Sequence, residues 1–314
     1  MGTTARAHPN IALIKYWGKA PGQENIPATP SLSITLDSLV TETHVATGPS
    51  RDELYFDDEP VADRKVLDWL EVLRQRYDIP PLEIRTANNF PTAAGLASSA
   101  SGFAALAVAL DAQCGLQLDA ATLSDLARRA SGSAARSIFG GYVAVQGPRW
   151  VAQPVLSPEA WPLKTVIAVT TTARKSVSSS EGMAISAATS PYYPGWVEST
   201  RADFTDALAA VRTRDFQALA ELAEFSCLKM HGLMLGSRPG LLYWKAATVS
   251  CLHAVRALRQ DGVDVFFTVD AGPQVKAICK PSAESDVRAA LAAVPGVEQI
   301  VVTGLGSGAR VIDP

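Results

Sequence analysis

The segment PTAAGLASSASG, residues 91–102, has the residue types of an anion-binding loop that opens a helix. Gly95 allows a tight turn without a Cβ penalty, and the serines supply hydroxyl donors. Phe103, Leu106 and Leu110 follow at helical spacing, so unpaired N–H groups and the positive end of the helix dipole are expected to favour a phosphate. The segment lacks the Gly-Lys-Ser/Thr ending of a Walker motif. A tightly packed helix start without a ligand is the alternative.

Asp270 is a candidate base, because it ends the apolar stretch 263–269 and precedes the turn Ala271-Gly272-Pro273. Such a turn points a side chain out of a sheet, where a carboxylate would be partly desolvated. An Asp that caps its own turn through backbone N–H groups is the alternative, and on this residue alone it is the more common case.

Lys15 lies inside the apolar run 11–17, which is unusual since lysine is rarely buried without an anionic partner. The alternative is a side chain that snorkels to water from a strand end. If Lys15 lay beside a carboxylate, its ammonium would hold that carboxylate ionised and in position.

Ser131, Gly132, Ser133 and Arg136 form a second compact set with anion-binding residue types. The rigid fork of arginine suits phosphate or carboxylate oxygens, and serines with backbone amides complete such a site. The two arginines at 128–129 are expected on the solvated face of a helix.

Three further serines, 178–180, follow Arg174 and Lys175 in a stretch rich in Ser, Thr, Pro and Gly. We place a domain boundary in this stretch, which divides the chain into residues 1–180 and 181–314. A flexible polar loop is the alternative to a phosphate-binding role for these serines.

The elements that would position these residues alternate without the regular βαβ rhythm of a parallel sheet, so the fold class is α+β. Strands are expected at 32–36, 43–46, 166–172, 263–269 and 275–279, with a final glycine-rich strand pair within 300–311. Helices are expected after residue 98, after the capping residue Asp119, and at 66–77, 201–230, 241–260 and 285–293.

Composition narrows the class of protein. The chain has 314 residues, 47% of them hydrophobic, enough for one large or two modest domains. A net charge of −3 gives no overall attraction to nucleic acid or an anionic membrane, so neither is expected as a partner. The four cysteines form no CxxC pair, which argues against a zinc site. Without an apolar signal or spanning stretch, a cytoplasmic protein is expected.

Four segments along the chain carry a family resemblance. They read AHPNIALIKYWGK (7–19), NNFPTAAGLASSASG (88–102), SGSAARSIFGG (131–141) and TVDAGPQ (268–274). Together, and in this order, they resemble the mevalonate diphosphate decarboxylases of the GHMP kinase superfamily. The resemblance implies an N-terminal GHMP ATP-binding domain like domain 2 of ribosomal protein S5, a ferredoxin-like C-terminal domain, and an active site in the cleft between them.

The resemblance also implies roles for single residues. Asp270, Lys15 and Arg136 match the catalytic positions. Substrate-binding positions are matched by Tyr16, Trp17, Gly18, Lys19, Ser131, Gly132, Ser133, Ala134, Ala135, Arg136 and Ser180. ATP-binding positions are matched by Pro91, Ala94, Gly95, Leu96, Ala97, Ser98, Ser99, Ser101 and Ser179. Ser180 replaces a bulkier Arg or Thr of other members, Trp17 is expected to pack or to shape the pocket wall, and no metal ligand is identified. His231 is expected to be a helix-packing histidine.

The reaction implied is the ATP- and Mg²⁺-dependent decarboxylation of (R)-5-diphosphomevalonate to isopentenyl diphosphate, with ADP, phosphate and CO₂, in the mevalonate pathway of isoprenoid biosynthesis. A homodimer through the second domain is expected. The chain departs from the family at Ala20-Pro21-Gly22 and at PATPSLSITL (27–36), near the terminal phosphate. Phosphomevalonate, decarboxylated to isopentenyl phosphate, is therefore an alternative substrate. A catalytically inactive GHMP-fold ligand sensor is a further alternative.

Overall fold

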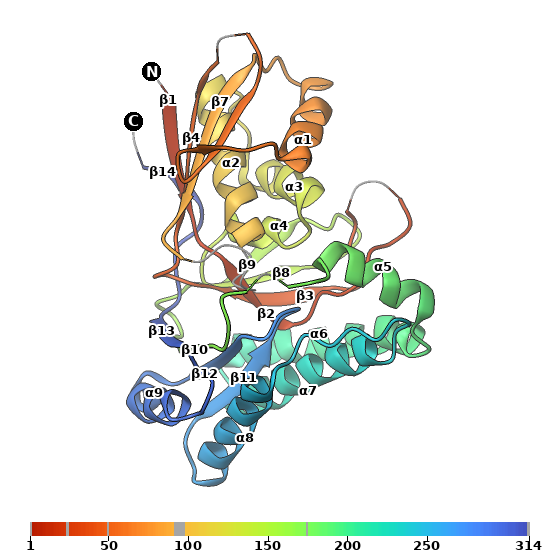
Figure 1. Ribbon diagram of the computed structural model, residues 1–314, viewed down its shortest axis with the longest axis vertical. Coiled ribbons are helices and arrows are strands. Elements are labelled where there is room, and N and C mark those ends of the chain that lie inside the picture. Colours follow the sequence, from red (N-terminus) through yellow and green to blue (C-terminus); the bar gives the residue numbers. More distant parts are fainter. Residues whose placement is uncertain (1, 23–24, 49, 91–97, 174, 313–314) are drawn as a thin grey trace.

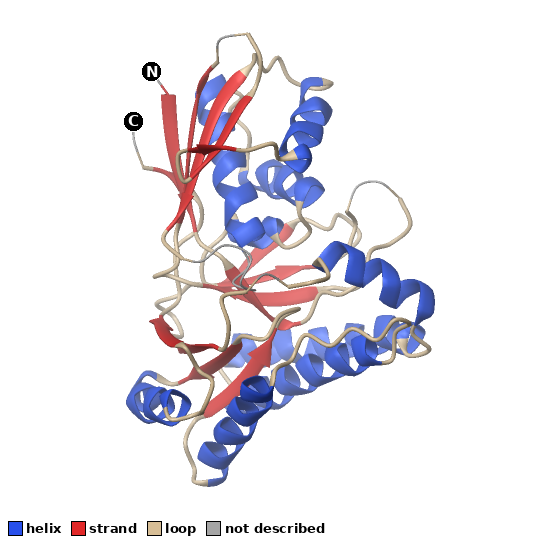
Figure 2. Ribbon diagram, viewed as in Figure 1, coloured by secondary structure: helices blue, strands red, loops and turns tan. Residues whose placement is uncertain are grey.

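The computed structural model describes residues 2–22, 25–48, 50–90, 98–173 and 175–312. These residues form an upper lobe, a middle sheet and a lower lobe, stacked along the long axis of the molecule (Figure 1). Both helices and strands occur in each part of the molecule (Figure 2), and most paired strands run antiparallel. Within the described residues, no helix is long and apolar enough to cross a membrane.

The upper lobe is a six-stranded sheet in the order β14-β1-β4-β7-β5-β6. Its strands are β1 (Gly2–Ala7), β4 (Thr41–Thr47), β5 (Glu53–Phe56), β6 (Glu59–Pro60), β7 (Leu82–Asn88) and β14 (Arg310–Val311). Helix α2 (Ser98–Cys114) packs on β1 and β4. Most of its residues are small or apolar, so the helix is buried on almost all sides. Helices α1 (Arg64–Arg74), α3 (Ala120–Ala130) and α4 (Ala134–Ser137) pack around α2 or one another.

The middle sheet has the order β2-β3-β8-β9. Its strands are β2 (Asn10–Ile14), β3 (Ser31–Thr35), β8 (Tyr142–Val145) and β9 (Ala152–Leu156). Helices α6 (Tyr193–Thr213) and α7 (Phe216–Leu235) pack against its β2 strand. The core here joins Leu13 and Leu32 from the sheet to Phe204 and Leu219 from the helices.

The lower lobe is a four-stranded antiparallel sheet in the order β11-β12-β10-β13. Its strands are β10 (Lys164–Val169), β11 (Val265–Val269), β12 (Val275–Cys279) and β13 (Gln299–Thr303). Helices α8 (Ala246–Gln260) and α9 (Glu284–Ala292), with the short η1 (Pro281–Ala283), pack against this sheet (Figure 1). Helix α5 (Ser179–Thr189) contacts α7.

Local signals located several elements well. Asp119 caps α3 through the backbone N–H of Thr122, at 2.7 Å, and the strand expected at 275–279 is β12. The helix expected at 201–230 is wrong, because the structure has α6 and α7 in its place. Arg214 adopts a left-handed conformation, with φ 58°, and Asp215 caps the new helix through the N–H of Ala218.

The final strand pair expected within 300–311 is also wrong. β13 pairs with β10 of the lower lobe, whereas β14 pairs with β1 of the upper lobe. Between them, residues 304–309 hydrogen-bond to Thr35, Asp37, Ile138 and Gly141. The chain therefore leaves the lower lobe after residue 303 and returns to the first strand, so that both ends lie side by side (Figure 1).

Candidate active site

A cavity of about 640 Å³ brings together residues that are far apart in the sequence. Residues 15–19 follow β2, residues 131–133 join α3 to α4, and Arg136 lies in α4. Residues 175–178 lead into α5, which begins with Ser179 and Ser180, and Asp270 follows β11. Predicted site residues on its wall are Lys15, Tyr16, Trp17, Lys19, Ser98, Ser99, Ser131, Gly132, Ser133, Arg136, Ser179, Ser180 and Asp270.

The Asp270 carboxylate lies between two buried lysines. The Nζ of Lys15 is 2.6 Å from Oδ1, and the Nζ of Lys276 is 3.1 Å from Oδ2. Both lysine side chains are 1% exposed, whereas that of Asp270 is 27% exposed. Burial alone would raise the pKa of Asp270, but the two ammonium charges outweigh it and hold this pKa well below its usual range. Asp270 is therefore a fixed anion at neutral pH.

Helix α7 holds the strand that ends at Asp270. β11 is the edge strand of its sheet, and α7 satisfies its free backbone groups with side chains spaced along one helix face. Glu224 Oε1 accepts from the Phe267 N–H at 3.2 Å, and Cys227 Sγ accepts from the Val269 N–H at 3.2 Å. His231 Nε2 lies 3.2 Å from the Val269 carbonyl, and burial lowers the pKa of His231 to about 3. His231 is thus buried and neutral, as expected for a packing residue.

Arg136 is buried, and its guanidinium is aimed by polar neighbours that the sequence analysis missed. Its Nε donates to Asn10 Oδ1 at 3.0 Å and its Nη1 to Ser31 Oγ at 2.8 Å. Burial lowers the pKa of Arg136 to about 10, with Asp270 opposing the shift, so the guanidinium stays charged. Among the described residues it has no carboxylate within ion-pair distance, which leaves this fork for an anionic ligand. In the sequence, the one feature that could have marked Asn10 as a site residue is its position just before the apolar run 11–17.

Two polar atoms in this cavity are buried without a hydrogen-bond partner among the described residues. They are the hydroxyl of Tyr16 and the indole Nε1 of Trp17. Burial raises the pKa of Tyr16 to about 12, so its hydroxyl remains a donor. Because a buried polar group without a partner is costly, these atoms indicate a polar ligand. The Trp17 carbonyl accepts from Trp196 Nε1 at 2.8 Å, which anchors the segment after β2 to α6.

Lys175 joins the start of α5 to the turn after Asp270. Its Nζ donates to Ser179 Oγ at 2.7 Å and to the Ala271 carbonyl at 3.2 Å. Burial lowers the pKa of Lys175, and the nearby Asp270 opposes that shift. Ser178 caps α5, because its hydroxyl oxygen accepts from the N–H of Glu181. Among serines 178–180, Ser178 therefore has a structural role.

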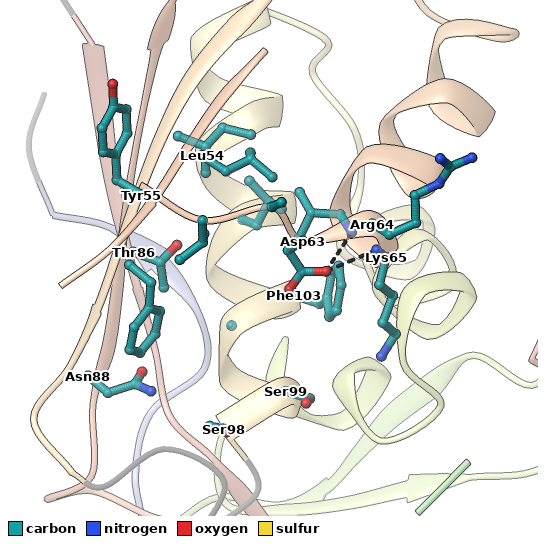
Figure 3. A pocket seen from close by; sticks show the side chains of 17 residues that line it. Leu54, Tyr55, Asp63, Arg64, Lys65, Thr86, Asn88, Ser98, Ser99 and Phe103 are labelled. Atoms are coloured by element: carbon teal, nitrogen blue, oxygen red, sulfur yellow. Dashed lines mark hydrogen bonds between the residues drawn. The ribbon is translucent and has the colours of Figure 1, made fainter. Parts of the chain in front are cut away.

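A second cavity, of about 620 Å³, has Leu54, Tyr55 and Phe103 among its lining residues (Figure 3). Both cavities share Ser98, Ser99 and Lys65 on their walls. Lys65 comes from α1, whose cap Asp63 accepts from the N–H groups of Lys65 and Val66 (Figure 3). Burial lowers the pKa of Lys65, with Asp63 opposing the shift. Nothing in the local sequence around Lys65 marks it as a cavity residue.

Some predicted residues lie elsewhere. Pro91, Ala94, Gly95, Leu96 and Ala97 lie outside the described residues. Of the described ones, Gly18, Ser101, Ala134 and Ala135 line neither cavity. The Ser101 hydroxyl is buried against Thr41 Oγ1, at 2.6 Å, and Gly18 has a φ of 108° that suits glycine alone. Arg128, expected on a solvated face, is instead buried and ion-paired with Asp125.

The charge of the first cavity indicates its ligands. Its described wall carries five basic side chains and the single carboxylate of Asp270. The basic residues are Lys15, Lys19, Lys65, Arg136 and Lys175. An enclosed excess of positive charge favours polyanions such as phosphate esters. No group of three or more His, Cys, Asp or Glu side chains suited to a metal ion occurs in the described part of the chain.

Gly132 offers a test of the phosphate-binding corner. A Cβ at this position would lie 2.6 Å from the Tyr16 hydroxyl oxygen and 2.8 Å from the ring. We expect Gly132→Ala to displace the Tyr16 ring and to raise KM for the anionic substrate by about tenfold or more, with a smaller change in kcat. The measurement is steady-state kinetics at saturating nucleotide.

The control for this variant is Gly195→Ala. Gly195 is exposed on α6, and a Cβ there would meet nothing within 4 Å. It is expected to leave KM unchanged. An unaltered KM in Gly132→Ala as well would place the anion site away from Tyr16.

Two family models match successive parts of the chain. Residues 7–149 match a family model described as diphosphomevalonate decarboxylase-like N-terminal domain, and residues 165–311 match one described as mevalonate 5-diphosphate decarboxylase C-terminal domain. The diphosphomevalonate decarboxylase of Eremothecium gossypii is 35% identical over 309 residues, which cover 89% of this chain and 77% of the relative.

Solved structures agree with this likeness. The crystal structure of mevalonate diphosphate decarboxylase from Staphylococcus aureus is similar with a TM-score of 0.92 and 34% identity, covering 99% of this chain and 98% of that one. A structure described as MDDEF in complex with MVAPP, AMPPCP and magnesium has a TM-score of 0.92 and 38% identity, covering 100% and 99%. These likenesses confirm the predicted two-domain α+β fold.

Proposed function

This chain belongs to the diphosphomevalonate decarboxylase family, and we propose that its two adjoining cavities carry out the ATP-dependent decarboxylation of diphosphomevalonate. The protein is an enzyme of the carboxy-lyase type with the GHMP kinase fold. The observation that carries the proposal for the site is the Asp270 carboxylate, held by two lysines at the wall of a cavity lined with cations.

The substrate is proposed to bind in the first cavity. Its diphosphate would contact Tyr16, Lys19, Ser131 and Ser133, where the buried Tyr16 hydroxyl lacks a partner among the described residues. Its carboxylate would contact the Arg136 guanidinium, whose Nη2 has no hydrogen-bond partner among the described residues. This placement puts the tertiary C3 hydroxyl near Asp270, because Asp270 and Arg136 line the same cavity.

ATP is proposed to occupy the second cavity, with its phosphates directed toward the first. Ser98 and Ser99 at the start of α2 lie on both walls, so the triphosphate would pass the N-terminus of that helix. Lys65 and Lys175 would then flank the phosphates from opposite lobes. The segment 91–97, outside the described residues, precedes α2 and retains its predicted part in phosphate binding.

Phosphoryl transfer in this arrangement needs alignment and charge neutralisation more than covalent chemistry. Asp270 accepts a hydrogen bond from the C3 hydroxyl and directs the oxygen toward the γ-phosphorus. ADP leaves as the new O–P bond forms, and the hydroxyl proton passes to an oxygen of the transferred phosphoryl group. A carboxylate with so low a pKa orients the hydroxyl better than it stores a proton.

Decarboxylation follows from the new leaving group. The C3–O bond breaks and its electron pair departs with phosphate, so positive charge develops at C3. The bond between C2 and the carboxylate then supplies its electron pair to form the double bond, which releases CO₂ and leaves isopentenyl diphosphate. Arg136 holds the carboxylate in place for this step.

We propose that Mg²⁺ arrives with the nucleotide, as magnesium is present in the related complex with MVAPP and AMPPCP. The side-chain oxygen atoms near the expected phosphates that could coordinate this ion are the hydroxyls of Ser98, Ser99 and Ser179. Such a donor set fits an ion held mainly by phosphate oxygens and water. When bound, the ion would neutralise phosphate charge.

A panel of three substrates tests the function. Mevalonate, its 5-phosphate and its 5-diphosphate are each offered with ATP and Mg²⁺, and ADP and CO₂ are measured together. We expect equal amounts of ADP and CO₂ with the 5-diphosphate, and a kcat/KM at least about 100-fold lower with the 5-phosphate, which lacks one anchored phosphate.

Other outcomes identify the alternatives. A preference for the 5-phosphate would make the protein a phosphomevalonate decarboxylase, ADP without CO₂ would make it a kinase, and neither product would leave a ligand sensor. The domain division at residue 180, the homodimer and the cytoplasmic location stay predictions. Light scattering of the 314-residue chain tests the homodimer.

A further inference from the structure

We propose that Lys276 is a positioning residue of this reaction, which fixes the Asp270 carboxylate from behind and never touches the substrate. The inference rests on the proposed function of Asp270. It concerns a side chain that sequence analysis did not single out, because nothing in VKAIC marks this lysine as different from a surface one.

The β register brings Lys276 to Asp270. Thr268 of β11 is the partner of Lys276 of β12 in the antiparallel ladder. Asp270 lies two residues beyond Thr268 and so projects to the same side, as a diagonal neighbour of Lys276. A long lysine side chain spans that diagonal, and its Nζ lies 3.1 Å from Oδ2.

The two lysines differ in their access to the cavity. Both side chains are 1% exposed, but Lys15 lines the first cavity, whereas Lys276 lines neither cavity. Lys15 holds Oδ1 and is close enough to the cavity to meet a bound phosphate. Lys276 holds Oδ2 from the sheet side. The ion pair with Asp270 is therefore the contact through which we expect Lys276 to act on turnover.

Other charged or titratable groups also face Asp270, and they must stay unchanged in the test. Arg136 approaches from α4, Lys175 from the segment before α5, and Cys227 and His231 from α7. Burial lowers the pKa of Lys276, and Asp270 is the first opposing influence. Lys276 is thus charged chiefly because Asp270 is there, as expected of a buried pair.

Two effects are expected when this lysine loses its charge. The carboxylate loses the contact that fixes Oδ2, so it can rotate away from the C3 hydroxyl. It also loses one of its two cations, so the pKa of Asp270 rises and the ionised form is lost at a higher pH than in the parent.

The primary test is Lys276→Met. We expect kcat to fall by about 10- to 100-fold while KM for both substrates changes by less than about threefold. The acidic limb of the kcat–pH profile is expected to move to higher pH. If the Met variant does not fold, kcat, KM and the kcat–pH profile are measured for Lys276→Gln instead. Glutamine is shorter than lysine and uncharged, but it is polar.

A double-mutant cycle then separates a positioning role from a structural one. In the Asp270→Asn background, Lys276→Met is expected to lower kcat by no more than about threefold, because the group it acts through is already neutral. If the loss were as large in that background as in the parent, Lys276 would act independently of Asp270 and the proposal would be wrong.

The matched control is Lys280→Met. Lys280 follows β12 and pairs with Asp264 at 2.8 Å, at the opposite end of β11. This variant is expected to keep the parental kcat and pH profile. A purely structural Lys276 would lower the melting temperature but leave both readouts unchanged. If the parent enzyme released no CO₂, the proposed function itself would be wrong. If the parent and the Lys276→Met variant were equally active, only the proposed role of Lys276 would be wrong.

Discussion

Replacing Asp270 by Asn is expected to lower kcat by at least about two orders of magnitude and to leave ATP affinity nearly unchanged. The amide keeps the size of the side chain but removes the charge that faces Lys15 and Lys276. It also presents an N–H₂ group where the carboxylate accepted a hydrogen bond, so the C3 hydroxyl loses its orientation. ATP affinity is spared because the proposed nucleotide contacts come from α1, α2 and α5.

The measurement is single-turnover formation of ADP and CO₂, with nucleotide affinity determined separately. Asp264→Asn is the matched control, because Asp264 lies just before β11 and pairs with Lys280 on the surface. It is expected to retain the parental rate. Turnover of Asp270→Asn within about tenfold of the parent would remove Asp270 from the catalytic role.

Replacing Arg136 by Lys is expected to lower kcat/KM for diphosphomevalonate by about 1,000-fold, through losses in both affinity and rate. Nε and Nη1 of Arg136 are held by Asn10 and Ser31, which aim the rest of the fork at the cavity. A lysine ammonium is a single point charge. It cannot keep the contacts with Asn10 and Ser31 and also hold the substrate carboxylate in place while positive charge develops at C3.

Arg74→Lys provides a control for the loss of a fork outside the cavity. Arg74 binds both oxygens of Asp52, at 2.7 Å each, at the C-terminal end of α1, and neither residue lines a cavity. This variant is expected to lower the melting temperature and to leave KM and kcat unchanged. Parental kinetics in Arg136→Lys would show that the substrate carboxylate binds elsewhere.

Local patterns in the sequence predicted the features that depend on local physics. Asp119 as a helix cap, β12 at 275–279 and Asp270 at a strand end all follow from spacing and from turn chemistry. The lysine in the apolar run left two alternatives open, burial beside an anion or a side chain that snorkels to water. The structure shows burial beside Asp270, which no local pattern could identify because 255 positions separate the two residues.

The rest depends on contacts that no local pattern encodes. Lys276 reaches Asp270 through the register of two strands. Lys65 shares a cavity wall with Ser99 because α1 lies beside α2, where the Lys65 Nζ is 4.8 Å from the centre of the Phe103 ring. The break between α6 and α7 depends on one left-handed residue, Arg214, inside a sequence that is helical on both sides. Arg128 was expected in water because it is charged, whereas its partner Asp125 makes burial tolerable.

The return of the chain to its first strand has a consequence for biosynthesis. β1 gains its second neighbour from residues 310–311, and residues 304–309 bond to the loops that close the upper lobe. A ribosome delivers the chain in order, so the upper lobe stays unfinished until nearly all of these residues have left the exit tunnel. Until then one side of β1 offers unpaired amides to neighbouring nascent chains.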